Sequence, residues 1–542
     1  MITMSSLLGC KNLTVQFSGQ MKPVLNIVSL DFQPGENVLI LGPSGSGKST
    51  LLSVLAGIIP NHIEAKVKGE VIRKQKVGIL FQDPDTQFCM QHVDEEIAFS
   101  LENRNVPTEE MVLKIKALLD MVGLKVGLHG KIDALSGGMK QRLALACVLA
   151  LEPDVLFLDE PTAQLDPASR KELFKLLKQL ASSTGKTMIM VEHVLDGCME
   201  WMDRVILLNK HGEVIGDGHP QYILAKYKSQ MEEAGIWRPE VYPYEWHEII
   251  RNKNHPLSKQ LNEKYLQSKM KKEALQHNTD SLMSAAAVTI SYERKTVLRD
   301  VNFQFGKGEW ISIIGKNGSG KSSLIKVLAK LKKISKGSVV FKDIHLKRWK
   351  ESQLYEKIGF VFQNPEWQFI TKTVYEEILF SGEQQNVRQE SAEAKALELL
   401  KEFGLLNYLN RNPFNLSFGQ KRRLSVATML LLNQEVLLLD EPTFGQDKHS
   451  AERLLCLLKK RQELGTTIVM VTHDMNIVDR YSNRVILFDE KSLCFDGHPF
   501  SLFSDDMLLE KTGLIPPLHY AYERAVKEEY LLGKQSILLV PN

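Results

Sequence analysis

The sequence lacks the usual features of secreted, metal-cluster and membrane-spanning proteins. Its six cysteines are scattered and form no C-x-x-C pair. This argues against a disulfide framework, a zinc site or an iron–sulfur cluster, and it fits a reducing cytosol. The start has no basic segment before an apolar core, so no signal peptide is expected. The most apolar stretch, 143–158, is interrupted by Glu152-Pro-Asp154 and does not reach the roughly 18 apolar residues that a spanning helix needs. The chain itself is therefore not expected to cross a membrane.

Strong charge of either sign is also missing. The formal net charge is only +3 over 542 residues, so no nucleic-acid partner is expected. The hydrophobic share of 43% is ordinary for a globular protein, and the length is enough for two or more domains with full cores.

A phosphate-binding pattern stands out against this background. The stretch GPSGSGKST fits G-x-x-x-x-G-K-[ST] and lies between an expected strand, 37–41, and an expected helix, 49–56. Its glycines allow backbone N–H groups to converge on phosphate oxygens, and the helix N-terminus adds partial positive charge. We expect Lys48 to pair with the β- and γ-phosphates and the Ser49 hydroxyl to ligate Mg²⁺. The candidate nucleotide-binding residues here are Gly42, Ser44, Gly45, Ser46, Gly47, Lys48, Ser49 and Thr50.

The same pattern occurs a second time. GKNGSGKSS follows another apolar run, 310–314, and supplies Lys321 and Ser322 at the matching places. The candidate nucleotide-binding residues of this copy are Gly315, Asn317, Gly318, Ser319, Gly320, Lys321, Ser322 and Ser323. Two matches in the same strand-to-helix context leave little room for coincidence.

Other motifs repeat in register with the two loops. FQDPDTQF returns as FQNPEWQF, LSGGMKQRLALA as LSFGQKRRLSVA, and VLFLDEPT as VLLLDEPT. The sequence therefore predicts two copies of one α/β domain. We expect domain 1 at 1–235, a polar and partly helical linker at 236–282, domain 2 at 283–518 and a C-terminal tail at 519–542, where 536–540 could add a strand.

Acidic pairs follow fully apolar runs in both copies. Such runs are typical of buried parallel strands, whose carboxyl ends are where these sheets bind ligands. The first acid of each pair is expected to hold Mg²⁺, and the second to orient or deprotonate the attacking water. The alternative is an acid that only caps a following helix. The Mg²⁺ candidates are Asp159 and Asp440, and the catalytic candidates are Glu160 and Glu441.

Further candidates follow other expected strands or begin helices. A glutamine amide can ligate Mg²⁺ or water, a histidine at a strand end can reach a γ-phosphate, and a Ser–Gly pair at a helix start offers an anion site. The histidines and serines could instead be structural. The aromatic residues upstream of each phosphate loop could stack on adenine or belong to the core. These candidates are Gln82, Gln363, His193, His473, Ser136, Gly138, Ser417, Gly419, Phe17 and Tyr292.

Together these motifs resemble the nucleotide-binding domains of ABC ATPases over almost the whole chain outside the linker and tail. The resemblance implies two P-loop ATPase domains of α/β fold, each with a mostly parallel sheet and a helical signature subdomain. It implies ATP as the bound nucleotide and two sites, each pairing one half's phosphate loop with the other half's signature. Met139 replaces the signature glutamine and Phe418 its middle residue, and Met139 makes equal rates at the two sites doubtful.

The glutamine motifs and the acids after them are similar to those of energy-coupling factor (ECF) ATPases. That resemblance implies a motor subunit at the cytoplasmic face of the membrane, partnered by a transmembrane coupling protein and a substrate-binding membrane protein. The fused form resembles the ATPase of hydroxymethylpyrimidine/thiamine-type importers. Acids beside the glutamine motif could face basic coupling helices, or they could be solvated helix starts. Those acids are Glu95, Glu96, Glu376 and Glu377. The alternative is a tandem ABC ATPase that acts on ribosomes or nucleic acid.

Overall fold

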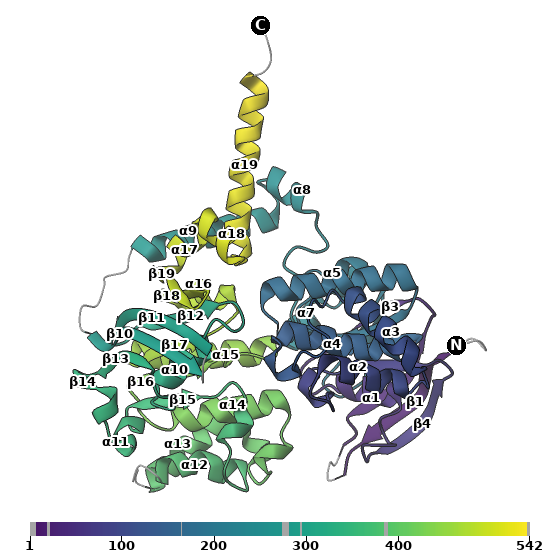
Figure 1. The fold of residues 1–542 in the computed structure, drawn as a ribbon, viewed down its shortest axis with the longest axis horizontal. Coiled ribbons are helices and arrows are strands. Elements are labelled where there is room, and N and C mark those ends of the chain that lie inside the picture. The colour runs from purple at the N-terminus through teal and green to yellow at the C-terminus, as the bar shows by residue number, and fades with distance from the viewer. Residues whose placement is uncertain are drawn as a thin grey trace. The chain divides into compact units, whose positions relative to one another are not determined.

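The computed structural model describes residues 7–18, 22–163, 165–273, 281–292, 295–383 and 389–538. The chain divides into two compact units (Figure 1). Unit 1 is built from Met1–Pro243 and Asp447–His449, and unit 2 from Tyr244–Gln446 and Ser450–Asn542. Each unit has the expected α/β architecture, with a mainly parallel sheet, a smaller antiparallel sheet and covering helices.

Six strands make the central sheet of unit 1. The apolar residues of its four inner strands are buried on both faces, and a single antiparallel pair, β8 with β9, closes one edge. The order is β5 (Val77–Leu80), β6 (Val155–Asp159), β7 (Thr187–Val191), β3 (Asn37–Leu41), β8 (Arg204–Leu208) and β9 (Val214–Gly218). The antiparallel sheet has the order β2 (Leu25–Phe32), β1 (Leu8–Gln16) and β4 (Lys66–Arg73).

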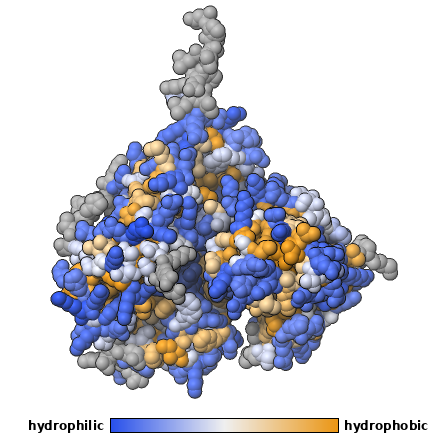
Figure 2. All heavy atoms as spheres, viewed as in Figure 1, coloured by the Kyte–Doolittle hydropathy of each residue, from blue (hydrophilic) through white to orange (hydrophobic). Residues whose placement is uncertain are grey.

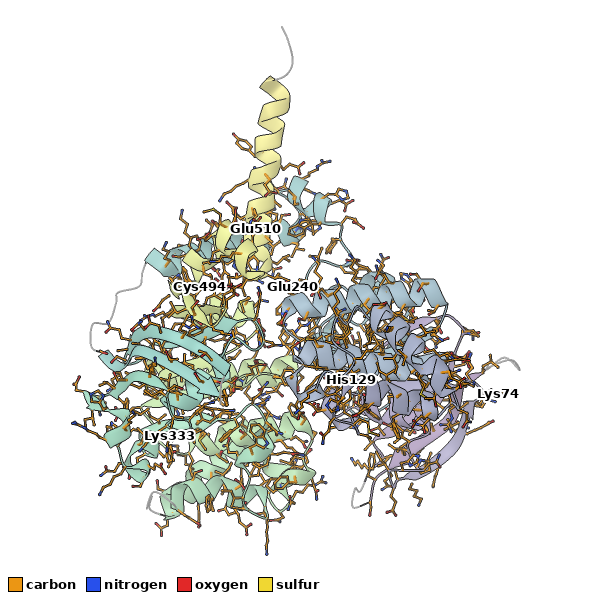
Figure 3. All side chains as sticks on the ribbon, viewed as in Figure 1. Lys74, His129, Glu240, Lys333, Cys494 and Glu510 are labelled. Carbon is orange, nitrogen blue, oxygen red and sulfur yellow. The ribbon has the colours of Figure 1, made fainter. Side chains whose placement is uncertain are left out.

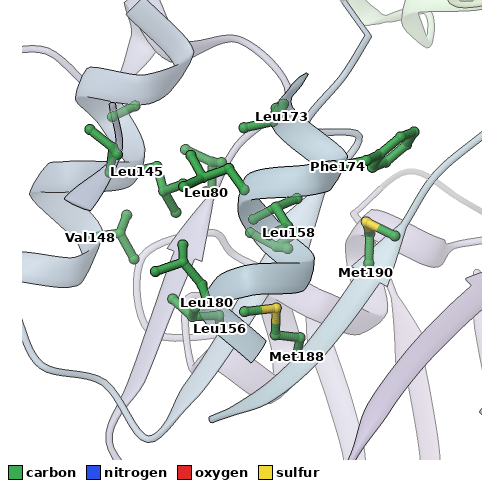
Figure 4. Close-up of a cluster of buried hydrophobic side chains, with 14 of the residues drawn as sticks. Leu80, Leu145, Val148, Leu156, Leu158, Leu173, Phe174, Leu180, Met188 and Met190 are labelled. Carbon is green, nitrogen blue, oxygen red and sulfur yellow. The ribbon is translucent and has the colours of Figure 1, made fainter. Parts of the chain in front are cut away.

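The helices of unit 1 pack on these sheets and on one another. Figure 4 shows Leu156 and Leu158 of β6 beside Leu145 of the helix that follows the signature and Leu180 of the next helix. The helices of this unit are α1 (Lys48–Ala56), α2 (Val93–Glu102), α3 (Thr108–Met121), α4 (Gly137–Ala150), α5 (Pro167–Thr184), α6 (Pro220–Lys226) and α7 (Lys228–Glu233). The segment after α7 is tied to the same unit, because the backbone N–H of Glu240, labelled in Figure 3, donates to Asp196 Oδ1 at 2.8 Å.

Unit 2 repeats this plan. Its central sheet has the order β15 (Ile358–Val361), β16 (Val436–Asp440), β17 (Thr467–Val471), β12 (Trp310–Gly315), β18 (Arg484–Asp489) and β19 (Ser492–Gly497). Its antiparallel sheet has the order β11 (Lys295–Gly306), β10 (Ser281–Tyr292), β13 (Lys336–Phe341) and β14 (Ile344–His345). The helices that correspond to those of unit 1 are α10 (Lys321–Leu328), α12 (Val374–Glu383), α13 (Gln389–Glu402), α14 (Phe418–Leu430), α15 (Lys448–Glu463), α17 (Pro499–Phe503) and α18 (Asp506–Thr512). Unit 2 also has α11 (Glu351–Tyr355) and α16 (Met475–Tyr481).

Most of the residues expected to form a polar linker, from Tyr244 onward, fold as part of unit 2. They form α8 (Trp246–Arg251) and α9 (Pro256–Glu273), which pack against α19 (Leu518–Leu538) in Figure 1. Ile249 and Leu261 are buried there, which the charge-rich composition of the segment concealed. Because α19 runs to Leu538, residues 536–538 of the stretch considered as a strand are helical, and 539–542 lie outside the described residues.

A buried polar cluster joins these helices to α16. The carboxylate of Asp479 accepts hydrogen bonds from Ser268 Oγ at 2.7 Å and from Tyr520 Oη at 2.6 Å, and it lies 3.2 Å from His519 Nε2. Burial raises the pKa of Asp479, but these three partners outweigh it and the net pKa is lowered. Lys271 of α9 also donates to backbone carbonyls at the end of α16. The cluster therefore fastens both ends of unit 2 to its core.

The face drawn in Figure 2 is mostly hydrophilic, with hydrophobic areas on both units. Across the residues that the structure describes, we find no helix with the length and apolar character needed to cross a bilayer.

Candidate active sites

Each phosphate loop connects a central strand to a helix whose first residue is the motif lysine. In unit 1 this connection lies between β3 and α1, and Gly45 and Gly47 adopt φ values of 82° and 86° that favour glycine. The Lys48 ammonium lies inside the loop and donates to the carbonyls of Gly42 at 2.8 Å and Pro43 at 3.0 Å. Burial lowers the pKa of Lys48, although Glu160 and Asp159 oppose that change. The carbonyls of the loop itself thus surround the buried Lys48 side chain.

Unit 2 builds the same loop between β12 and α10. Lys321 Nζ donates to the carbonyls of Gly315 and Lys316, at 2.8 Å in each case. In both loops one buried serine hydroxyl, Ser46 Oγ and Ser319 Oγ, has no hydrogen-bond partner among the described residues. A phosphate oxygen is the kind of group that would satisfy these hydroxyls, so both loops fit a bound nucleotide.

The first acid of each pair lies beside the loop serine. Ser49 Oγ donates to Asp159 Oδ1 at 2.9 Å, and Ser322 Oγ donates to Asp440 Oδ1 at 3.1 Å. Burial, and then the neighbouring glutamate, raises the pKa of each aspartate to about 6. Hydroxyl and carboxylate oxygens are the ligands that Mg²⁺ prefers. The donor set at each site therefore suits this ion.

The second acid of each pair is held by the histidine of the neighbouring strand end. His193 Nε2 lies 2.9 Å from Glu160 Oε1, and His473 Nε2 lies 3.1 Å from Glu441 Oε1. Burial raises the pKa of each glutamate, but the histidine outweighs this effect and the net pKa is lowered. Both glutamates also have positive φ, 47° and 50°, which a non-glycine residue adopts rarely. A carboxylate kept ionised and fixed in this way can accept a proton or a hydrogen bond from water.

The two glutamines differ between the units. Gln82 Nε2 donates to Glu160 Oε2 at 2.8 Å, so unit 1 brings its glutamine, glutamate and histidine together. Gln363 is exposed.

The signature serines begin α4 and α14 as helix caps. Ser136 Oγ accepts from Met139 N, and Ser417 Oγ accepts from Gln420 N, at 3.4 Å in each case. Gln420 completes a capping box because its Oε1 accepts from Ser417 N at 2.9 Å, whereas Met139 has no side-chain group for this bond. Gly138 and Gly419 lie within the first turns of these helices.

The two aromatic candidates have different surroundings. Phe17 is partly buried against the core of the antiparallel sheet. Tyr292 is 48% exposed, its Oη lies 3.1 Å from Ser323 Oγ on α10, and the Lys332 ammonium lies over its ring. Tyr292 is therefore available to a ligand beside the phosphate loop, and Phe17 is less so.

Two of the four acids proposed to contact membrane partners are buried, which corrects that expectation. Glu96 Oε2 accepts from the backbone N–H groups of Cys89 at 2.9 Å and Met90 at 2.7 Å. Glu377 Oε2 accepts from Ile370 N, Thr371 N and Thr371 Oγ1, at 3.0, 2.8 and 2.9 Å. Each carboxylate therefore fixes the loop that precedes its helix. It points inward because it is the next residue after the exposed acid and so lies on a different face of the helix.

Glu95 and Glu376 are the exposed members of these acid pairs. Glu95 Oε2 lies 3.0 Å from His92 Nδ1. Another acid of α2, Asp94, lies 2.7 Å from Nδ1 of His129, which Figure 3 labels.

Sequence reasoning missed two buried residues near the sites. Glu192 accepts from Thr162 Oγ1 at 2.7 Å and from His193 N at 2.9 Å, and burial raises its pKa. Arg422, on α14, is fully buried. Both lie where the two repeats differ, Glu192 against Thr472 and Arg422 against Gln141, so a comparison of the halves was the available signal.

The sequence pattern of the family described as ABC transporter matches residues 25–163 and 298–444, one block in each unit. The chain belongs to the ABC transporter family. Its two units are ABC ATPase domains, and the protein is an ATPase. This confirms the predicted fold class and the assignment as an ATPase.

Relatives of full length carry the same arrangement. A Bacillus subtilis protein, YkoD, named provisionally as an HMP/thiamine import ATP-binding protein, is 38% identical over 96% of this chain and 98% of its own. CPE1583 of Clostridium perfringens, named provisionally as an ABC transporter ATP-binding protein, is 35% identical over 93% of each chain. A structure of ribosome-bound archaeal Pelota and ABCE1 covers 92% of this chain and 80% of its own with a TM-score of 0.63, but its 21% identity shows the fold alone.

Proposed function

We propose that this ABC ATPase is the motor subunit of an ECF-type importer that takes up a vitamin or vitamin precursor, with thiamine or its hydroxymethylpyrimidine precursor as the first candidate. One observation supports the substrate: the relative with 38% identity over 96% of this chain is named for HMP/thiamine import. The glutamine motifs support the ECF type. Separate integral membrane subunits would bind the substrate and couple it to the motor, which would lie peripherally on the cytoplasmic face.

Two complete sets of catalytic residues support hydrolysis at both sites. Glu160 and Glu441 are each held by a histidine and can accept the proton of the attacking water. Lys48 and Lys321 are placed to exchange their carbonyl partners for phosphate oxygens. Mg²⁺, held by Ser49 and Asp159 or by Ser322 and Asp440 with a glutamine nearby, would neutralise charge on the transferred phosphoryl group.

The remaining candidates complete this proposal. By family resemblance, each nucleotide also meets the signature residues of the other unit, so that ATP draws the two units together. Ser417 and Gly419 would serve the phosphate loop of unit 1, and Ser136 and Gly138 that of unit 2. Tyr292 would stack on one adenine, and Phe17 would line the other.

Transport by the assembled complex tests this function. The tagged full chain would be purified with its membrane subunits from detergent-solubilised membranes and reconstituted in liposomes. ATP-dependent uptake of labelled thiamine or hydroxymethylpyrimidine is expected, and Glu160→Gln plus Glu441→Gln should abolish it. Copurification of ribosomal proteins without membrane subunits would overturn the importer and leave the ATPase standing. Uptake of a different vitamin would overturn only the substrate.

A further inference from the structure

The segment that begins at each glutamine, 82–88 in unit 1 and 363–369 in unit 2, is here called the glutamine segment. One ion pair joins it to the signature helix in both units. Lys140 of α4 lies 2.6 Å from Asp85, and Lys421 of α14 lies 2.5 Å from Glu366. Both carboxylates are well exposed, so each pair contributes only about 0–1 kcal/mol. This shared link is weak.

Unit 2 adds partly buried hydrogen bonds between its glutamine segment and α14. Gln368 Nε2 donates to Ser425 O at 2.9 Å and to Thr428 Oγ1 at 2.7 Å, and Gln368 Oε1 accepts from Ser425 Oγ at 2.8 Å. Ser425 and Thr428 are buried. Breaking these bonds would leave the buried hydroxyls of Ser425 and Thr428 without their partner Gln368, so the segment and the helix are held together.

Arg422 makes a second buried link from the same helix. Its Nη1 donates to Phe362 O at 2.8 Å, directly before Gln363, while its Nε and Nη2 have no partner among the described residues. Burial lowers the pKa of Arg422 to about 10, against the opposing effect of Glu441 and Asp440. Removing this fully buried guanidinium would leave the Phe362 carbonyl without its Arg422 donor.

In unit 1 the corresponding glutamine side chain bonds to the sheet instead. Gln87, which aligns with Gln368, accepts from Phe81 N at 3.0 Å and donates to Ile79 O at 3.2 Å, so it bonds to β5 and the residue after it. The residues of α4 that align with Arg422, Ser425 and Thr428 are Gln141, Ala144 and Cys147. The first is buried, and its Nε2 has no partner in the part of the chain that the structure describes.

We propose that Arg422 and Gln368 are positioning residues that make the glutamine segment of unit 2 move with its signature helix, whereas the segment of unit 1 moves with the sheet. The inference rests on the proposed function in one respect: ATP is the ligand that displaces α14, through the signature at its start. The glutamine segments precede the acids proposed to face the membrane subunits, of which Glu95 and Glu376 are exposed. Signature movement in unit 2 is therefore transmitted to one membrane contact and not, by this route, to the other.

Hydrogen exchange read by mass spectrometry on the full chain tests this. The parent carries Glu160→Gln and Glu441→Gln so that ATP is retained, and peptides over 81–90, 362–371 and 417–430 are followed with and without Mg-ATP. The test variant adds the residues of unit 1, Arg422→Gln, Ser425→Ala and Thr428→Cys. Unit 1 already accommodates these residues at the same places in its fold, which favours a folded variant.

In the parent, ATP should change protection of 417–430 and 362–371 together and of 81–90 much less. In the variant the change at 362–371 should fall about threefold or more, while that at 417–430 persists. With Arg422→Lys in place of Arg422→Gln, a cationic donor is kept, and part of the ATP-induced change at 362–371 should return. Lys421→Ala, introduced alone into the parent, breaks only the shared ion pair and should leave most of the ATP-induced change at 362–371.

Three results would overturn the inference: an undiminished response at 362–371 in the variant, an equal response at 81–90 in the parent, or no response of 417–430 despite protection of the phosphate loops. If ATP protects neither phosphate loop, the proposed function fails instead. The attachment of 362–371 to α14 can then be tested without ATP. Hydrogen exchange over 362–371 should be faster in the variant than in the parent, and an unchanged rate would overturn the inference.

Discussion

The burial of Glu377 leads to a prediction that separates a structural acid from a surface acid one residue away. Glu377 is 3% exposed and accepts three hydrogen bonds from Ile370 and Thr371. Glu376 is exposed and accepts one, from Thr373 N at 3.1 Å, in a capping box that Thr373 Oγ1 completes. Replacing each with alanine should therefore have very different costs.

The magnitude follows from the groups left without partners. A hydrogen bond to a charged acceptor contributes about 1.5–3 kcal/mol, and losses within one cluster are not additive. Glu377→Ala should thus destabilise unit 2 by about 3–5 kcal/mol, and Glu376→Ala by about 1 kcal/mol. At roughly 2–3 °C per kcal/mol for a unit of this size, the melting temperatures should differ by about 4–12 °C.

Differential scanning calorimetry of the full chain measures this difference, with the transition of unit 1 as an internal reference. Glu377→Gln keeps one acceptor oxygen and should fall between the two alanine variants. Equal melting temperatures for Glu377→Ala and Glu376→Ala would refute the reasoning, because they would show that the buried bonds contribute no more than the exposed cap.

Three further predictions follow from other contacts. Glu160→Gln plus Glu441→Gln should lower ATP turnover by about 10² or more while ATP binding persists, since only the proton-accepting carboxylates are lost; undiminished phosphate release would disprove their catalytic role. Met139→Gln should raise the melting temperature of unit 1 by a stability gain of about 0.5–1 kcal/mol, because it supplies the group that Gln420 uses in the capping box of unit 2; no gain in calorimetry would contradict this. Asp479→Ala should destabilise unit 2 by about 3–5 kcal/mol because three buried donors lose their acceptor, and a loss under 1 kcal/mol in urea titration would argue against the buried cluster.

The repeated architecture was predictable because its signals are local. The run Val155–Asp159 is apolar up to its acid, and β6 is a fully buried parallel strand that ends at Asp159. The phosphate loops likewise follow from the spacing of glycines and a lysine, and they lie between strand and helix as predicted.

Other features depend on contacts that no short pattern encodes. Glu95 and Glu96 look alike in sequence, but only the second turns inward to bond a loop. From the sequence alone Arg422 would be expected on the exposed face of its helix. It is buried because α14 packs against β15 and Phe362, the residue after that strand. The burial of Leu261 depends on α19, more than 250 residues later in the chain.

The packing of α8 and α9 beneath α19 also determines where this polypeptide can be divided. A break between Pro243 and Trp246 would leave each fragment with the complete core of its own unit. A break just after α9 would deprive the second fragment of Ile249, Leu261 and Ser268, and Asp479 would lose a buried donor. Fission into two separately encoded ATPases is therefore compatible with the fold at the first position. At the second, the charged segment that resembles a linker in the sequence would have to be supplied in trans.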